Sequence, residues 1–279
     1  MTHRVPLSAQ LSMLIVATCL LVAIFAPLIA PYGPTEIVGD IWQEGLWSAE
    51  QSGDRVLVLG ADSLGRDMLT RLVYGIRTSI GLAFVIVTLS FVIGILLGFI
   101  AAIKGWLVDQ ILSRGVDVVL AIPTLISALA VLSILGTSIP VLIAVIAILE
   151  SVQIFRIARA LAMDVGAAEY VEVARLRGES TAWILFREIL PNTLAPLAAE
   201  FGVRFGFVFL FVSALSFLGL GVQPPTADLG SMVRENGQGL NFGIVAPLIP
   251  AGAIAVLTIA VNLIVDWVAG RQAENRDLE

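Results

Sequence analysis

Six long apolar segments dominate the chain, and they predict membrane-spanning helices. Each is close to the ~20 residues that an α-helix needs to cross a bilayer. Lipid offers the backbone no hydrogen bonds, so apolar segments of this length must satisfy their own backbone groups as helices. The alternating pattern of a membrane barrel strand is absent. The predicted spans are residues 11–30, 79–103, 116–135, 139–155, 194–220 and 246–269.

Composition supports a membrane protein. Hydrophobic residues make up 58% of the 279 and charged residues only 14%, whereas soluble domains are about 25% charged. The first apolar segment follows His3 and Arg4, is longer than the apolar core of a signal peptide, and has no small-x-small cleavage site after it. We therefore interpret it as an uncleaved first span.

The distribution of Lys and Arg predicts the orientation. With the N-terminus inside, ten of these residues lie in inside segments and five in outside segments, while Arg204 falls within a span. Because cytoplasmic loops carry the excess of positive charge, both termini are expected in the cytoplasm. The long polar segments are then residues 31–77 and 221–245 outside, and residues 156–192 inside.

Two pairs of glycines predict close contacts between helices. Gly94 and Gly98 are four residues apart, as are Gly202 and Gly206. This spacing places both glycines of a pair on one helix face, where another backbone can approach closely.

The chemical inventory excludes several functions. The only lysine, Lys104, follows Ile103, so the Gly-Lys-Ser/Thr of a Walker A loop cannot form and this chain is not the site of ATP hydrolysis. The only histidine is His3 and the only cysteine is Cys19, which removes Ser–His catalysis and a His/Cys zinc site from the bundle. An intramembrane hydrolase would depend on Asp and Glu alone. No basic stripe predicts a nucleic-acid partner.

The inside polar segment has helical character. Residues 169–177 are expected to form a short helix in which Tyr170 and Ala174 share a face. Gly178 fits the end of this helix, because glycine adopts the left-handed conformation without steric cost. A second short helix, rich in bulky residues, is expected to end at Pro191, just before the fifth span.

This segment resembles the "EAA" signature of ABC importer permeases. Its elements are Glu172-Val173-Ala174, Gly178 four residues later, and Ile189-Leu190-Pro191. Val173 replaces the alanine usual at that position, and Glu188 stands where many relatives have histidine. The resemblance implies a coupling helix that docks into a groove on a cytoplasmic ATPase. The coupling residues that it implies are Glu169, Tyr170, Glu172, Ala174, Arg175, Gly178 and Pro191.

Further motifs narrow the resemblance to the C-subunit-like permeases of dipeptide, oligopeptide and nickel importers. Residues 59–75, 117–123 and 215–225 are similar to that subfamily, and the outside motif contains Asp62, Gly65, Arg66 and Asp67. The implied fold is all-α, with six transmembrane helices in the type I ABC importer arrangement. Its expected parts are a first helix with an outside loop (residues 1–75), a permease domain (76–270) and a cytoplasmic tail (271–279).

The resemblance also implies function and partners. The chain would be a non-enzymatic permease subunit in a bacterial inner membrane, without a cofactor of its own. Its partners would be a second homologous permease, two cytoplasmic ATPases that hold ATP and Mg²⁺, an extracytoplasmic solute-binding protein and the lipid bilayer. Di- and oligopeptides are the expected substrates, with nickel or another small solute as alternatives. A secondary transporter is a further alternative, but inverted repeats or broken helices are not visible in the sequence.

Three charged residues fall within predicted spans. They are Glu150, Glu200 and Arg204, and a charge at the bilayer centre costs ~2.5–3.5 kcal/mol on insertion scales. Glu200 precedes Arg204 by four residues, which is the favourable order for a helical ion pair. These residues either line the translocation path or form a static ion pair near the cytoplasmic end of the span.

Overall fold

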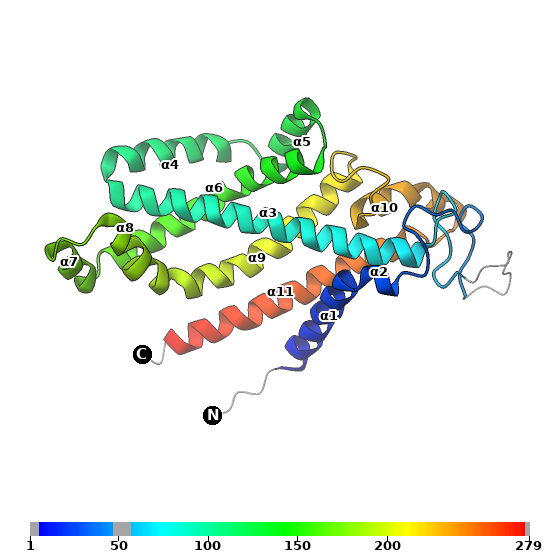
Figure 1. Ribbon diagram of the computed structural model, residues 1–279, viewed down its shortest axis with the longest axis horizontal. Helices are drawn as coiled ribbons and strands as arrows, with labels where there is room; N and C mark the ends of the chain where they lie inside the picture. The colour runs from blue at the N-terminus through cyan, green and yellow to red at the C-terminus, as the bar shows by residue number, and fades with distance from the viewer. Residues whose placement is uncertain (1–5, 47–56, 277–279) are drawn as a thin grey trace. The chain divides into compact units, whose positions relative to one another are not determined.

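The computed structural model describes residues 6–46 and 57–276, and it is almost entirely helical (Figure 1). Within these residues the only extended pairings are two isolated bridges, Ile37–Arg66 and Ala61–Asp67. His3 lies outside the described residues. The elements are α1 Leu7–Ile24, α2 Ala26–Ile29, α3 Met68–Lys104, α4 Trp106–Leu120, α5 Thr124–Leu135, α6 Ile139–Gly166, α7 Glu169–Leu176, α8 Thr181–Trp183, the π-helix η1 Ile184–Ile189, α9 Leu190–Phe217, α10 Leu229–Asn236, the 3₁₀-helix η2 Gly237–Phe242 and α11 Leu248–Arg276.

Five helices in the described part of the chain are long and apolar enough to cross a membrane. They are α1, α3, α6, the continuous helix Thr181–Phe217 that contains α8, η1 and α9, and the first part of α11. The bent pair α4 and α5 supplies the sixth span if it is counted as one. The predicted all-α fold with six spans is confirmed in this form.

The helix at the predicted third span is interrupted, which the apolar pattern did not predict. The axes of α4 and α5 differ by 85°. Pro123 lies at the bend; it has no N–H for the helical ladder, and it disfavours helical geometry at Ile122. The expectation that no span is broken is therefore wrong, and helix continuity does not separate an ABC permease from a secondary transporter here.

Most helices extend beyond the apolar segments that predicted them. Helix α3 begins at Met68 rather than near residue 79, and α6 continues to Gly166 rather than residue 155. The polar loop before α3 therefore ends at Asp67, not at Arg77. The first apolar segment is instead interrupted at Phe25, so that α1 and α2 are separate. Hydropathy alone misses these ends, because the polar turns at the ends of a long helix lie outside the apolar stretch.

The chain forms two compact units. The first contains residues up to Phe84, Gly136–Ile139, and Phe205 onward. In it α11 packs against both α1 and α10, and α1 lies beside α11 in Figure 1. Its small buried core of Met68, Met232 and Ala246 is covered by partly buried apolar side chains that include Trp42. The functional boundaries at residues 75 and 270 stay a prediction.

The second unit contains residues 85–135 and 140–204. Helix α6 supplies much of its core, with Ile146, Ile154, Phe155 and Ala158 buried. Phe91 of α3 packs against Phe201 of α9, with their ring centroids 5.1 Å apart. Three helices of this unit thus share one apolar core.

The glycines of α3 bring it close to α6, as their spacing predicts. A Cβ added at Gly94 would lie 2.7 Å from Ile154 Cβ and 2.8 Å from Ser151 O. A Cβ at Gly98 would lie 2.8 Å from Phe155 O. These distances are shorter than van der Waals contact, and two of the opposing atoms are backbone carbonyl oxygens that cannot rotate away. In the first unit, Gly206 similarly approaches Asn262 and Val261 of α11.

We predict that Gly94→Ala lowers the thermal unfolding midpoint of the purified protein, because overpacking of a tight interface costs about 1–3 kcal/mol. Gly81→Ala is the matched control. It lies on the same helix, its added Cβ would meet nothing within 4 Å, and alanine is the better helix former. Equal midpoints for the two variants would contradict the close α3–α6 contact.

Candidate functional site

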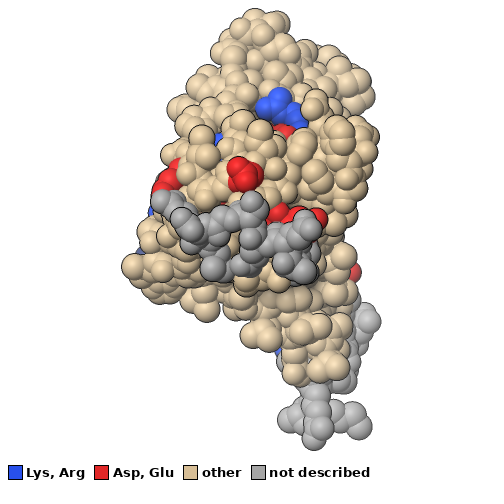
Figure 2. All heavy atoms as spheres, turned by 90° about the vertical axis from the view of Figure 1, so that its right-hand side faces the viewer, with Lys and Arg blue, Asp and Glu red and all other residues tan. Residues whose placement is uncertain are grey.

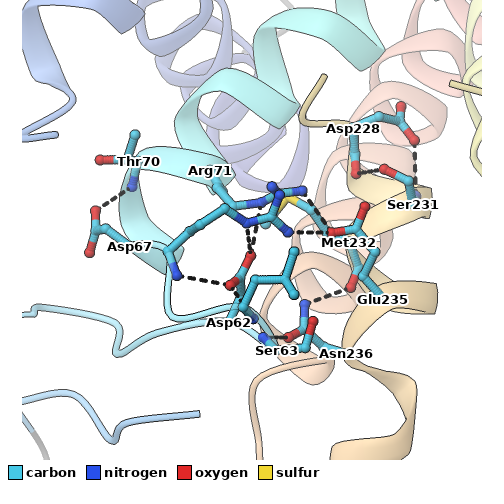
Figure 3. A network of polar contacts seen from close by, with 12 residues as sticks. Asp62, Ser63, Asp67, Thr70, Arg71, Asp228, Ser231, Met232, Glu235 and Asn236 are labelled. Carbon is cyan, nitrogen blue, oxygen red and sulfur yellow. Dashed lines mark hydrogen bonds and ion pairs between the residues drawn. The ribbon is translucent and has the colours of Figure 1, made fainter. Parts of the chain in front are cut away.

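Four charged residues form a network in the first unit, here called the ion cluster: Asp62, Arg66 and Arg71, which are buried, and Glu235, which is partly buried. Figure 3 shows Asp62, Arg71 and Glu235 pointing toward one another. Arg66 Nε donates to Asp62 Oδ2 at 2.7 Å, and Arg66 Nη2 donates to Glu235 Oε2 at 2.7 Å. Arg71 Nη2 donates to the same Glu235 oxygen at 2.9 Å, and its Nε lies 3.3 Å from Asp62 Oδ2. Two carboxylates and two guanidinium groups therefore balance in charge, which makes their burial tolerable.

The turn that contains Asp62 fixes the ion cluster locally. Asp62 Oδ1 accepts hydrogen bonds from the backbone N–H groups of Leu64 and Arg66, at 2.8 and 2.9 Å. Gly65 has a φ of +76°, and a Cβ there would lie 2.3 Å from Gly39 O. The outside motif predicted from sequence is thus a tight turn that needs glycine at this position.

The same loop is tied to both of the helices that flank the ion cluster. Asp67 Oδ2 accepts from Thr70 N at 2.7 Å, in the manner of an N-terminal cap for α3. Asn236, the last residue of α10, accepts at its Oδ1 from Ser63 N at 2.8 Å and from Trp42 Nε1 at 3.3 Å. The loop is therefore held by side-chain contacts at both ends.

Asp228 anchors the start of α10 to α3. Its Oδ2 accepts from Ser231 N at 3.0 Å, and its Oδ1 accepts from Ser79 Oγ at 2.7 Å. Burial raises the pKa of the Asp228 carboxyl, against the opposing effect of the hydrogen bonds from Ser79 and Ser231. Asp228 thus caps α10 and joins it to α3 through one carboxylate.

Sequence reasoning found only part of this arrangement. It identified Asp62, Gly65, Arg66 and Asp67, but it gave no role to Glu235, Asn236 or Asp228, or to Arg71, which falls within the motif of residues 59–75. The Asp228-x-x-Ser231 spacing is an N-cap signal that could have been recognised. The pairing of Arg71 with Glu235 spans 164 residues, and no local sequence pattern predicts it.

Asp and Glu side chains form several red patches on the face of the molecule shown in Figure 2.

In the second unit, the predicted coupling segment forms α7 and ends as its sequence predicts. Gly178 has a φ of +80°. Gly178 N donates to Arg175 O at 3.0 Å, and Glu179 N donates to Ala174 O at 3.2 Å. These two bonds are those of a Schellman motif, which needs a residue that accepts the left-handed conformation.

Tyr170 and Ala174 were expected to share a face of α7, but in the structure they lie on different faces. Val171 and Ala174 form the buried side, whereas Tyr170, Val173 and Leu176 are exposed, Leu176 by 82%. Spacings of three and of four residues both bring side chains onto one face, and the buried pair Val171 and Ala174 has the spacing of three. Glu169, Glu172 and Arg175 are also exposed. A short helix thus presents apolar and charged side chains together on its free surface.

The segment after α7 does not stop at Pro191, contrary to expectation. Helix α8, capped by Ser180 Oγ, continues through η1 into α9 as one helix. Pro191 is the second residue of α9 and is exposed. A π-helix bonds each N–H one residue further back than an α-helix, and this local change in bonding accompanies the proline within an unbroken helix. The continuous helix from residue 181 to 217 therefore begins shortly after α7 ends.

The charged residues of the predicted spans also lie together in the second unit. Arg204 Nε donates to Glu200 Oε1 at 2.6 Å, and Arg204 Nη1 lies 3.8 Å from Glu150 Oε2. Glu200 lies near the middle of the helix 181–217 rather than near its end. The static ion pair and the path-lining role both stay predictions at this point.

A second ion pair in this unit was not predicted. Arg159 of α6 donates from Nε and Nη2 to the two carboxylate oxygens of Asp109 on α4, and Ser113 Oγ also donates to Asp109. A bidentate pair of this kind fixes orientation as well as distance. It joins the first half of the broken span to α6.

Comparison with known proteins identifies relatives along most of the chain. Residues 94–274 match the family described as binding-protein-dependent transport system inner membrane component. The dipeptide transport system permease protein of Haemophilus influenzae is 34% identical over 264 residues, which cover 92% of this chain and 87% of that protein. The di/tripeptide transport system permease protein of Pseudomonas aeruginosa is 35% identical over 266 residues, which cover 93% and 84%.

Two further similarities cover less of the chain. The glutathione transport system permease protein of Pectobacterium atrosepticum is 34% identical over 209 residues, which cover 75% of this chain and 69% of that protein. A crystal structure described as an amino acid ABC transporter with histidines superposes with a TM-score of 0.54 at 19% identity, over 73% of this chain and 94% of the other. At that identity the structure supports the fold alone.

We predict that Arg71→Gln destabilises the loop before α3, because Asp62 and Glu235 then share a single guanidinium group in a buried site. Breaking a buried ion pair costs about 3–5 kcal/mol. The expected result is faster proteolysis within residues 31–67 and a lower thermal midpoint. Arg77→Gln, an exposed position on the same helix, should change neither. Proteolysis of Arg71→Gln at the rate of the unchanged protein would show that the ion cluster does not hold the loop.

Proposed function

The chain belongs to the family of binding-protein-dependent transport system inner membrane components, and from this premise we propose that it is a permease subunit of an ATP-driven importer of di- and oligopeptides. The observation that carries the proposal is the similarity along 92–93% of the chain to permeases named for dipeptides and di/tripeptides. These names favour peptides over nickel as the substrate. The multi-pass architecture of the described residues fits a subunit that forms half of a translocation path.

Force for transport reaches this chain through α7. The chain has no Walker A sequence, so ATP and Mg²⁺ are bound by two cytoplasmic ATPase subunits. The exposed side chains Tyr170, Val173 and Leu176 give α7 an apolar surface for docking on an ATPase, and Glu169, Glu172 and Arg175 supply charged contacts around it. A small exposed apolar surface with a polar rim is typical of a protein interface.

Displacement of α7 can pass directly into a membrane span. Its buried residues Val171 and Ala174 face inward, and α7 packs against η1. Because η1 continues into α9 without interruption, a push on α7 moves the cytoplasmic end of that span, including Pro191. In this proposal the coupling segment and α9 act as one mechanical element.

The other partners follow from the family. A second homologous permease completes the path, and a binding protein delivers the substrate to the outside surface. The ion cluster and the Asp62–Asp67 turn would hold the outside loop rigid for that docking. Glu150, Glu200 and Arg204 would line the path within the membrane.

The proposed substrate class is tested by uptake in cells. Deletion of the gene for this chain should abolish accumulation of a labelled dipeptide through this system, and expression of the chain should restore it. Intact dipeptide uptake in a deletion strain that lacks other peptide importers would overturn the proposal. Loss of nickel accumulation with normal dipeptide uptake would redirect it to the alternative substrate.

We expect Gly178→Val to uncouple ATP hydrolysis from transport while the spans still insert, because valine is strained at a φ of +80°. The measurement is binding-protein-stimulated ATPase activity of the assembled complex, which should fall to its unstimulated rate. Gly178→Asn should retain more coupling, since asparagine tolerates this conformation better. Gly166→Val is the matched control, because Gly166 has no positive φ and space for a side chain. Normal coupling in Gly178→Val would refute the role of this turn.

The orientation is tested by labelling single cysteines in a Cys19→Ala background. With both termini in the cytoplasm, Asp40→Cys and Glu44→Cys should react with an impermeant maleimide added to intact cells. Lys104→Cys, at the other end of α3, should react only after the membrane is opened. The reverse pattern would place α7 outside and remove its access to cytoplasmic ATPases.

A further inference from the structure

We infer that Glu150, Glu200 and Arg204, here called the intramembrane triad, bind the side-chain ammonium group of a lysine in the transported peptide. This inference rests on the proposed function, and it adds the chemical group that the path recognises. Nothing in the similarity to peptide permeases assigns a ligand to these three positions.

The charges of the intramembrane triad do not balance. Arg204 is engaged first by Glu200, through a hydrogen bond of 2.6 Å from Nε to Oε1. Among the described residues, the one ion pair of Glu150 is with Arg204 Nη1, at 3.8 Å, and Glu150 Oε2 accepts no hydrogen bond. One guanidinium group thus serves two carboxylates, and the site has a formal charge of −1. The ion cluster of the first unit, in contrast, is neutral.

Glu150 is the residue that lacks a partner of its own. It is only 2% exposed, and its Oε2 has no hydrogen-bond partner among the described residues. Burying an ionised carboxylate without hydrogen bonds is costly, and such groups are normally paired. A carboxylate held in this state near the middle of a candidate span is typical of a functional site in a membrane protein.

A primary ammonium group matches what the site lacks. It carries one positive charge and three N–H donors, so it can donate to Glu150 Oε2 while Arg204 stays bonded to Glu200. The Glu200 and Arg204 side chains are each 20% exposed, so a cation can approach from their side, and a shift of the Arg204 side chain would admit it to the buried carboxylate of Glu150. A lysine side chain of a transported peptide carries such an ammonium group at neutral pH.

The cation has two conceivable sources, the substrate or a Lys or Arg of the second permease. The substrate is favoured because a permanent partner would hold the site neutral and closed in every state. The two sources differ in their consequences, since loss of a permanent partner impairs assembly, whereas loss of a substrate contact changes selectivity.

The test compares uptake of Ala-Lys and Ala-Glu by the complete transporter with one and the same binding protein. Glu150→Gln brings the formal charge of the site to zero, and Arg204→Gln brings it to −2. We expect Glu150→Gln to lower the ratio of Ala-Lys to Ala-Glu uptake by about tenfold, which is a modest part of the attraction between opposite charges at short range, and Arg204→Gln to raise it. Asp164→Asn, at an exposed position on the same helix α6, should leave the ratio unchanged.

Co-purification of the second permease is measured in parallel. A lowered ratio in Glu150→Gln with normal assembly supports the inference. An unchanged ratio, an equal loss of both peptides, or a loss of the second permease without a change in ratio overturns it. If the unaltered transporter takes up neither peptide, the proposed function itself fails, so the two failures are distinguishable.

Discussion

The interior of a bilayer offers no hydrogen bonds to a backbone or to a charged side chain, and this constraint accounts for most of the structure. It forces the backbone into helices, and it requires each buried charge to find its partner within the protein. A protein interior makes the same demand, and the ion cluster of the first unit meets it with hydrogen bonds of 2.7 Å between opposite charges. Glu150 has no such hydrogen bond at its Oε2 among the described residues, and it is therefore the residue for which we propose a functional role.

The ion cluster, the turn at Gly178 and the intramembrane triad differ in charge balance and exposure, and we assign them different roles. The ion cluster joins a loop, α3 and α10 in one unit, and its two positive and two negative groups leave no net charge to attract a ligand. The Schellman turn at Gly178 has a different role, since it ends α7, whose exposed side chains form the proposed docking surface for an ATPase. The intramembrane triad is unbalanced and partly open, and these are the properties expected of a transient binding site.

The number and approximate places of the spans were predictable from sequence, because a stretch of about twenty apolar residues favours a membrane-spanning helix over other structures. The stop at Gly178 was predictable as well, since positive φ is a local property of one residue. The bend before Thr124 and the continuity through Pro191 were not predictable from sequence. Both depend on how a proline is accommodated by its neighbours, and one proline breaks a helix while the other does not.

Long-range pairing was beyond sequence reasoning for a different reason. Arg71 and Glu235 were visible as charged residues, but their partnership depends on the packing of α10 near the start of α3. The unsatisfied oxygen of Glu150 became apparent only when the distances to Arg204 were known. Local patterns thus determine elements, whereas the balance of charge within a site depends on tertiary structure.

The central claim, that this chain moves peptides by power received from ATPases, is tested most directly in proteoliposomes that contain the complete transporter and its binding protein. The account predicts accumulation of a labelled dipeptide when ATP is supplied on the ATPase side and no ion gradient is present. Accumulation driven by a proton or sodium gradient without ATP would contradict it.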